Sequence, residues 1–264
     1  MAGFPPAYLS STSNSLTELL RDLAPEALPR LSDRESVEVP EGTTIICFRT
    51  ADGILMAGDR RATIGNLIAS HAMEKVRAAD DFSVIGIAGT AGVALDLIRL
   101  FQLELEHYEK IEDARLSLGG KANRLAAMLR GNLGLAMQGL TVVPMFAGVD
   151  ESRPDGQIFS FDVTGGKYEE HRFHAIGSGS GFARGALKKL WQPDQSTEAG
   201  LAVAVEALFD AADDSATGGP DFVRAIAPTV FTVELATGVR QLPSETVLAT
   251  AAEVVAERTR KAQS

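Results

Sequence analysis

The chain has 264 residues, of which 45% are hydrophobic, and this suits one sizeable globular domain with a tail. Its net charge of -10 argues against nucleic-acid binding, because neutralising phosphates requires clustered lysine and arginine. A single cysteine, Cys47, excludes an internal disulfide framework and suits a reducing compartment, so we expect a cytoplasmic protein. The start of the chain lacks the pattern of a secretory signal, and we expect no membrane span.

Residues 1–42 differ in composition from the rest of the chain. They hold five prolines, a polar run of serine, threonine and asparagine, and seven acidic against three basic residues. Such a segment gives little periodicity for a helix or strand apart from one short helical pattern. We predict a tail or propeptide here, followed by one domain over residues 43–264.

From Thr43 the pattern is that of β-strands. Two runs, residues 43–50 and 54–58, flank Ala51-Asp52-Gly53, and Asp-Gly between such runs predicts a tight hairpin. A Gly-Asn pair at residues 65–66 indicates a second hairpin, and residues 82–89 predict a buried strand. The first third of the domain is therefore expected to be mostly β.

Helices and further strands follow. Apolar residues at three- and four-residue steps predict two helices separated by Gly119-Gly120, and later turn signals are Asp155-Gly156 and Gly165-Gly166. Ser244 is a candidate N-cap for the last helix. The predicted helices are 93–108, 121–138, 182–191, 200–213 and 244–260, and the predicted strands are 144–149, 157–163, 168–174 and 229–235. Because strands and helices do not alternate, we predict an α+β domain of antiparallel sheets sandwiched by helices.

The histidines and the cysteine offer no known catalytic pattern. His71, His107, His171 and His174 lie outside the motifs of zinc proteases and α/β-hydrolases, and the chain has no phosphate-binding loop motif. We interpret His107 as a solvated helix residue and the last two as structural. Cys47 has no adjacent histidine, so a buried structural thiol is favoured over a nucleophile.

The junction Gly42-Thr43 is the most informative position. In the simpler interpretation, Gly42 is a flexible entry and Thr43 an ordinary strand residue. In the other, cleavage makes Thr43 an N-terminus, and its α-amine, with a reference pKa of about 7.7 to 8.0, serves as the base that a threonine hydroxyl needs. A Lys75–Asp59 pair near such a threonine would supply a fixed positive charge. A surface ion pair is the alternative for these two residues.

Five segments together resemble catalytic β subunits of the 20S proteasome. They are Thr43-Thr44-Ile45-Ile46, Ala57-Gly58-Asp59-Arg60-Arg61-Ala62-Thr63, Gly86-Ile87-Ala88-Gly89-Thr90, Gly177-Ser178-Gly179 and Asp214-Ser215-Ala216-Thr217-Gly218-Gly219. The resemblance covers about residues 40–245. Residues 104–110 and 130–133 are similar to the actinobacterial branch, in which long propeptides occur.

The resemblance implies a four-layer αββα sandwich, the Ntn-hydrolase fold, and a threonine endopeptidase that cuts its own Gly42–Thr43 bond. It implies Thr43 as nucleophile, its freed amine as base, Lys75 as electrostatic activator, Asp59 as the partner of Lys75, and the Gly89 N–H as an oxyanion donor. The residues matched to the surrounding hydrogen-bond network are Ser178, Asp214 and Thr217. Many family members carry serine where this chain has Thr217.

The resemblance also implies how substrate is held. Thr63, Gly89 and Ala91 would bind a substrate strand through their backbone groups. Such binding depends little on which side chains the substrate carries. The pocket for the residue before the scissile bond would be lined by Ala62, Met73, Arg77, Ile87, Ala91 and Leu95. Because five of these six are apolar, apolar residues should fit best. Core packing is the alternative for Ile87, Ala91 and Leu95.

The family further implies partners and no metal or other cofactor. Expected partners are other copies of the chain in heptameric rings, proteasome α subunits, a ring ATPase and polypeptide substrates, which in actinobacteria carry a small protein modifier. One rival is the two-ring bacterial ATP-dependent threonine protease, which also begins Thr-Thr but is shorter. The other is a non-catalytic scaffold subunit, against which the joint presence of Gly42, Thr43, Asp59 and Lys75 argues.

Overall fold

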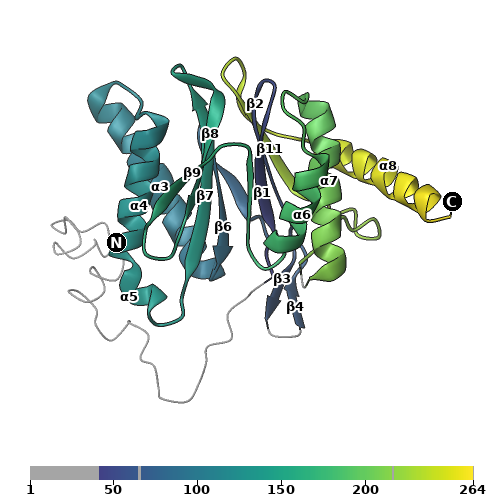
Figure 1. Ribbon diagram of the computed structural model, residues 1–264. Helices are drawn as coiled ribbons and strands as arrows, with labels where there is room; N and C mark the ends of the chain where they lie inside the picture. The colour runs from purple at the N-terminus through teal and green to yellow at the C-terminus, as the bar shows by residue number, and fades with distance from the viewer. Residues whose placement is uncertain (1–41, 65–66, 216, 264) are drawn as a thin grey trace, which may run out of the picture.

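A computed structural model describes residues 42–64, 67–215 and 217–263. Two five-stranded antiparallel sheets lie face to face (Figure 1). The first contains, in spatial order, β10 (Phe173–Ile176), β1 (Ile45–Thr50), β2 (Gly53–Gly58), β11 (Thr229–Glu234) and β12 (Gly238–Gln241). The second contains β5 (Val76–Asp80), β6 (Ser83–Gly89), β7 (Val142–Asp150), β8 (Arg153–Phe161) and β9 (Lys167–Glu170). In a separate two-stranded sheet, β3 (Ala62–Ile64) pairs with β4 (Leu67–Ser70) in antiparallel register.

Helices cover both outer faces of the paired sheets. On the first sheet lie α6 (Ser180–Leu190), α7 (Thr197–Asp214) and α8 (Ser244–Ala262), which share a buried apolar cluster with β1 and β2. On the second sheet lie α3 (Ala91–Glu112) and α4 (Leu118–Gly131), with the short α5 (Leu133–Ala136) after them. A third cluster fills the space between the sheets. These layers confirm the α+β class and the αββα order of the predicted fold.

The strand register brings distant segments to one end of the sandwich. β1 is antiparallel to both of its neighbours, with Ile45 opposite Gly58 of β2 and Ile176 of β10. The start of β1 therefore meets the ends of β2 and β10. In the second sheet β5 is antiparallel to β6, with Val76 opposite Gly86, so the start of β5 meets the end of β6. Ile45, fully buried between the sheets, fixes the head of β1 in the core.

Several sequence predictions match the structure. The Asp52-Gly53 turn joins β1 to β2, with Thr50 opposite Gly53. The helical pattern of residues 93–108 lies within α3, and strand 82–89 corresponds to β6. The second predicted turn, residues 65–66, lies outside the described residues. Of the helices in the described part of the chain, none combines the length and apolar character that crossing a bilayer requires.

Other predicted boundaries are wrong. Gly119-Gly120 lies inside the first turn of α4 instead of separating two helices, because Ser117 is the N-cap and its hydroxyl accepts a hydrogen bond from Gly120 N at 3.2 Å. Asp155-Gly156 lies within β8, and the turn falls at residues 151–152 instead. There the Asp150 carboxylate accepts hydrogen bonds from the N–H groups of Ser152 and Arg153.

Two more differences concern strand division and a cap. The predicted strand 168–174 is two strands, β9 and β10, which belong to different sheets. Ser244 is the first residue of α8, and Pro243 occupies the N-cap position. Strands β5 and β12 were not predicted from the sequence at all.

Candidate active site

Thr43 lies two residues before β1 and is 8% exposed. Its N–H donates to Ser178 Oγ at 3.2 Å, and its carbonyl accepts from Gly179 N at 3.4 Å. Gly177, at the end of β10, has a φ of +95°, and a Cβ there would lie 2.1 Å from the Thr43 carbonyl oxygen. Only glycine fits this close approach. The turn at residues 177–179 therefore holds the peptide group of Thr43 in one position.

Asp59 lies at the end of β2, beside the start of β1, and is 1% exposed. Its Oδ1 accepts hydrogen bonds from Thr44 N and from Lys75 Nζ, both at 2.7 Å. Its Oδ2 accepts from Arg61 N at 2.9 Å and from Gly218 N at 3.0 Å. Four donors on two oxygens leave the buried carboxylate well compensated and fixed in orientation.

Lys75 lies immediately before β5 and is 5% exposed. Its Nζ contacts three oxygens: Asp59 Oδ1 at 2.7 Å, the Gly42 carbonyl at 2.5 Å and the Arg61 carbonyl at 2.5 Å. Burial lowers the pKa of Lys75 below its ordinary value, and the Asp59 carboxylate opposes this shift. Three acceptors match the three protons of an ammonium group, whereas a neutral amine has only two. The side chain is thus bound as a cation, and it faces the carbonyl of the Gly42–Thr43 peptide bond.

Thr217 and Gly218, which follow α7, also contact the site. Gly218 N is one of the Asp59 donors, and the Thr217 carbonyl accepts from Arg61 Nη1 at 3.2 Å. Thr217 is fully buried, whereas Asp214 is exposed at the end of α7. Among the described residues, the hydrogen bonds of Thr43 do not include Asp214. The structure therefore brings together Thr43, Asp59, Lys75, Ser178 and the Thr217 segment, and places Asp214 outside this set.

A small cavity of about 30 Å³ opens beside Thr43. Gly89, which ends β6 with a φ of +115°, lines it, as does Lys75. Of the six predicted pocket residues, five line this cavity: Ala62, Met73, Ile87, Ala91 and Leu95. Arg77, within β5, is not among the lining residues, and Thr63 lies buried in β3. Ile87 also belongs to the apolar core, as the alternative interpretation expected.

Sequence analysis missed part of the site. Glu74, Ala94 and Ile98 also line the cavity. The backbone groups of Thr44, Arg61 and Gly218 hold Asp59. Backbone donors have no side-chain signature, and helix periodicity was the one signal that could have placed Ala94 and Ile98 on the inner face of α3.

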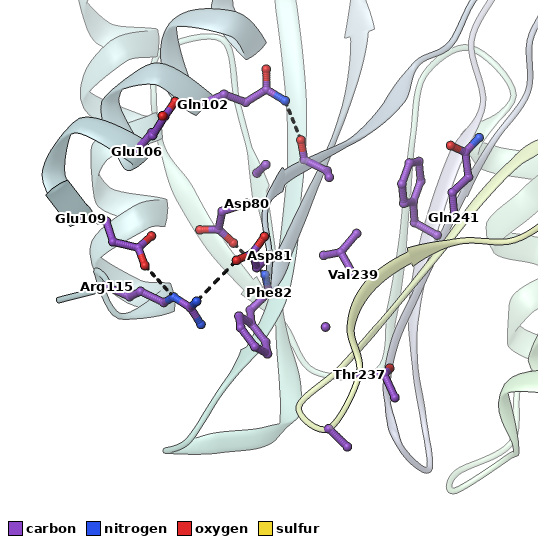
Figure 2. A pocket seen from close by; sticks show the side chains of 15 residues that line it. Asp80, Asp81, Phe82, Gln102, Glu106, Glu109, Arg115, Thr237, Val239 and Gln241 are labelled. Carbon is purple, nitrogen blue, oxygen red and sulfur yellow. Dashed lines mark hydrogen bonds and ion pairs between the residues drawn. The ribbon is translucent and has the colours of Figure 1, made fainter. Parts of the chain in front are cut away.

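A larger groove of about 880 Å³ lies between α3 and the β11–β12 hairpin. Figure 2 shows Arg115 of this groove paired with two carboxylates, Glu109 at 3.0 Å and Asp81 at 3.4 Å. Gln102 donates to the Ala78 carbonyl at 2.7 Å. The groove contains none of the predicted site residues. We therefore locate the candidate active site at Thr43.

Cys47, His107 and His174 lie as interpreted, whereas His171 does not lie in a strand. Cys47 is fully buried in β1, and burial raises the pKa of its thiol far above the ordinary value, so it is not an activated nucleophile. His107 is exposed on α3. His174 in β10 lies 3.1 Å from Glu170, and burial lowers its pKa. His171 is exposed between β9 and β10.

The four layers, with Thr43 just before an inner strand, are those of the Ntn-hydrolase fold, as the resemblance implied. A family model described as proteasome subunit matches residues 39–226. The chain therefore belongs to the proteasome subunit family.

Two relatives from actinobacteria are similar over most of their length. Proteasome subunit beta of Saccharopolyspora erythraea is 53% identical over 259 residues, which is 95% of this chain and 91% of the relative. Proteasome subunit beta of Streptomyces griseus is 54% identical over 246 residues, which is 91% of this chain and 87% of the relative. These matches agree with the actinobacterial resemblance of the sequence.

Proposed function

We propose that this chain is a β subunit of a proteasome core particle and acts as a threonine endopeptidase after cutting its own Gly42–Thr43 bond. One observation carries the proposal. The Lys75 ammonium is held by Asp59 at 2.7 Å and contacts the Gly42 carbonyl, which belongs to the bond to be cut, at 2.5 Å. A buried cation at that oxygen would stabilise the negative charge that develops there during attack.

Self-cleavage would begin with attack of Thr43 Oγ1 on the carbonyl carbon of Gly42. The carbonyl electrons move to the oxygen beside Lys75, and the Thr43 hydroxyl loses its proton. The carbon–nitrogen bond then breaks as the Thr43 nitrogen gains a proton, which leaves an ester between Gly42 and Thr43 Oγ1. Water hydrolyses this ester to a Gly42 carboxylate, a free hydroxyl and a free α-amine.

Peptide hydrolysis would reuse the same groups. The freed amine of Thr43 accepts the proton of Oγ1 as this oxygen attacks a substrate carbonyl, and it passes that proton to the leaving amine. The nearby Lys75 cation disfavours protonation of the amine, which keeps it available as a base. The Gly89 N–H is proposed as the oxyanion donor, and Ser178 Oγ, 3.2 Å from Thr43 N, would hold the amine. Water then hydrolyses the acyl ester and restores Thr43. Asp214 has no step in this scheme.

Substrate binding and assembly complete the proposal. A substrate strand would add to backbone groups of Thr63, Gly89 and Ala91, with an apolar side chain in the small cavity. We propose rings of this subunit stacked against α-subunit rings in the cytoplasm. A ring ATPase would feed these rings with polypeptides that carry a small protein modifier.

The test is the mass of the subunit in assembled particles. Thr43→Ala should stay at full length because it has no hydroxyl to attack Gly42. Thr43→Ser keeps the hydroxyl and should be shortened at Gly42, as should the unmodified chain. Trimming of Thr43→Ala in the absence of other proteases, or a full-length unmodified chain in complete particles, would refute self-cleavage. The second result would favour a scaffold subunit.

A further inference from the structure

The hydroxyl of Ser215 links the end of α7 to the segment that holds Asp59. Ser215 Oγ donates to the Ala211 carbonyl at 2.5 Å. Because a serine hydroxyl has only one proton, its other contacts must be accepted ones. The Thr217 hydroxyl, 3.0 Å away, and Thr217 N, at 3.4 Å, therefore both donate to Ser215 Oγ. One oxygen thus fixes both the backbone and the side chain of Thr217 relative to the last turn of the helix.

The contacts continue from Thr217 to the buried ion pair. Gly218 is the next residue, and its N–H donates to Asp59 Oδ2 at 3.0 Å. Asp59 in turn holds Lys75 at 2.7 Å. Moving the Thr217 backbone would therefore shift or remove one of the four donors of the Asp59 carboxylate.

The same serine is also close to the turn that holds Thr43. A Cβ on Gly179 would lie 2.9 Å from Ser215 Oγ, and Gly179 N is the group that donates to the Thr43 carbonyl. This closeness leaves the segment after α7 little room to shift toward Thr43. Ser215 is not among the residues that line the cavity beside Thr43.

We propose that Ser215 is a positioning residue for peptide hydrolysis: it holds the Thr217–Gly218 segment so that the Gly218 N–H stays on Asp59. This inference rests on the proposed function. Because Ser215 lies outside the substrate cavity, its loss should lower kcat and leave KM almost unchanged. The expected effect of losing these hydrogen bonds is about a tenfold fall in kcat.

The experiment uses full-length chains assembled with their α subunits, with activity on a fluorogenic peptide divided by the amount of processed Thr43 termini measured by mass. Ser215→Ala and Thr217→Val are made singly and together. Because both act through one contact, the double variant should be no slower than the slower single variant. Ser196→Ala is the matched control, since it removes the N-cap hydroxyl at the other end of α7. It should lower the melting temperature and leave kcat unchanged.

The outcomes are separable. A value of kcat within twofold of normal for Ser215→Ala, or effects of the two substitutions that multiply, would overturn the positioning role. Activity that survives in Thr43→Ala would instead overturn the proposed function. Should Ser215→Ala fail to assemble, Ser215→Thr and Ser215→Val decide, because they are nearly equal in volume and differ in the hydroxyl. We expect Ser215→Thr to be about tenfold faster than Ser215→Val, and equal rates would refute the proposal.

Discussion

Replacing Lys75 with methionine tests whether the Lys75 ammonium group activates Thr43 or whether the side chain only packs in the core. Methionine keeps most of the bulk of the stem and removes the ammonium group. In the processed chain, which begins at Thr43, the change leaves the Arg61 carbonyl without this donor and takes one of four hydrogen bonds from Asp59. Asp59 keeps its three backbone donors, from Thr44, Arg61 and Gly218. The carboxylate is therefore not left bare.

The size of both effects follows from these contacts. Breaking a buried ion pair by removing one partner costs about 3 to 5 kcal/mol of stability. We expect the lower end of that range, because Asp59 keeps three backbone donors. Loss of one preorganised charge that favours the transition state costs about 100- to 1,000-fold in rate, which is about 2.7 to 4 kcal/mol of transition-state stabilisation.

The chain offers a matched control for this change. Lys121 in α4 is also buried, and its Nζ pairs with Asp80 at 2.6 Å. Asp80 likewise keeps two other donors, Phe82 N at 3.0 Å and the Ser83 hydroxyl at 2.7 Å. Lys121 does not line the cavity beside Thr43. Lys121→Met should therefore lose comparable stability and keep the normal rate.

Both variants are best expressed as chains that begin at Thr43, so that failed processing is not mistaken for failed turnover. The assay compares peptide hydrolysis per assembled particle with the melting temperature. If Lys75→Met assembles and hydrolyses peptides at close to the normal rate, Lys75 is a structural residue and the proposed mechanism is wrong. If Lys121→Met is slowed as much as Lys75→Met, the loss of rate reflects stability alone.

Three further predictions concern the same site. Asp59→Asn should impair both assembly and hydrolysis, measured as above, because each carboxylate oxygen accepts two donors and an amide NH₂ must face two of them in either orientation. Gly42→Ala should slow self-cleavage in a time course of precursor mass, because Gly42 has a φ of +92° that alanine disfavours, whereas Gly119→Ala, with open space around its Cβ, should process normally. Peptides that end in Leu, Phe or Tyr should be cut faster than those that end in Asp or Arg, because the residues lining the cavity beside Thr43 are mostly apolar, and a clear preference for acidic ends would contradict this.

The sequence predicted correctly those helices and strands that are determined by residues within a single segment. The Asp52-Gly53 hairpin and the amphipathic α3 both follow from a turn signal or a periodicity within one segment. Strand β5 has no such alternation, since Val76 and Ala79 are buried, and it becomes a strand by pairing with β6. The start of α4 depends on a contact from far along the chain, because Leu118 N donates to the Asp150 carboxylate at 3.1 Å.

The residues of the candidate site also fall into those that the sequence could predict and those that it could not. Thr43, Asp59 and Lys75 could be proposed from their side-chain types and the motifs around them, and they lie together. The groups that orient Asp59 are backbone N–H donors, including one from Gly218, 159 residues further along the chain. No sequence pattern marks such a donor. For the same reason the sequence could not show that the Ser215 hydroxyl contacts Thr217.

The position of β1 has a consequence for the chain end that maturation would create. Free termini usually fray, because their first residues have few contacts. Here the new terminus would lie two residues from Ile45, which is fully buried, on a strand bonded to β2 on one side and β10 on the other. Cutting the chain would therefore add almost no motion to Thr43. The entropy cost of holding the Thr43 hydroxyl and its α-amine close together is already met when the chain folds. The reaction itself would therefore need no further ordering of the enzyme.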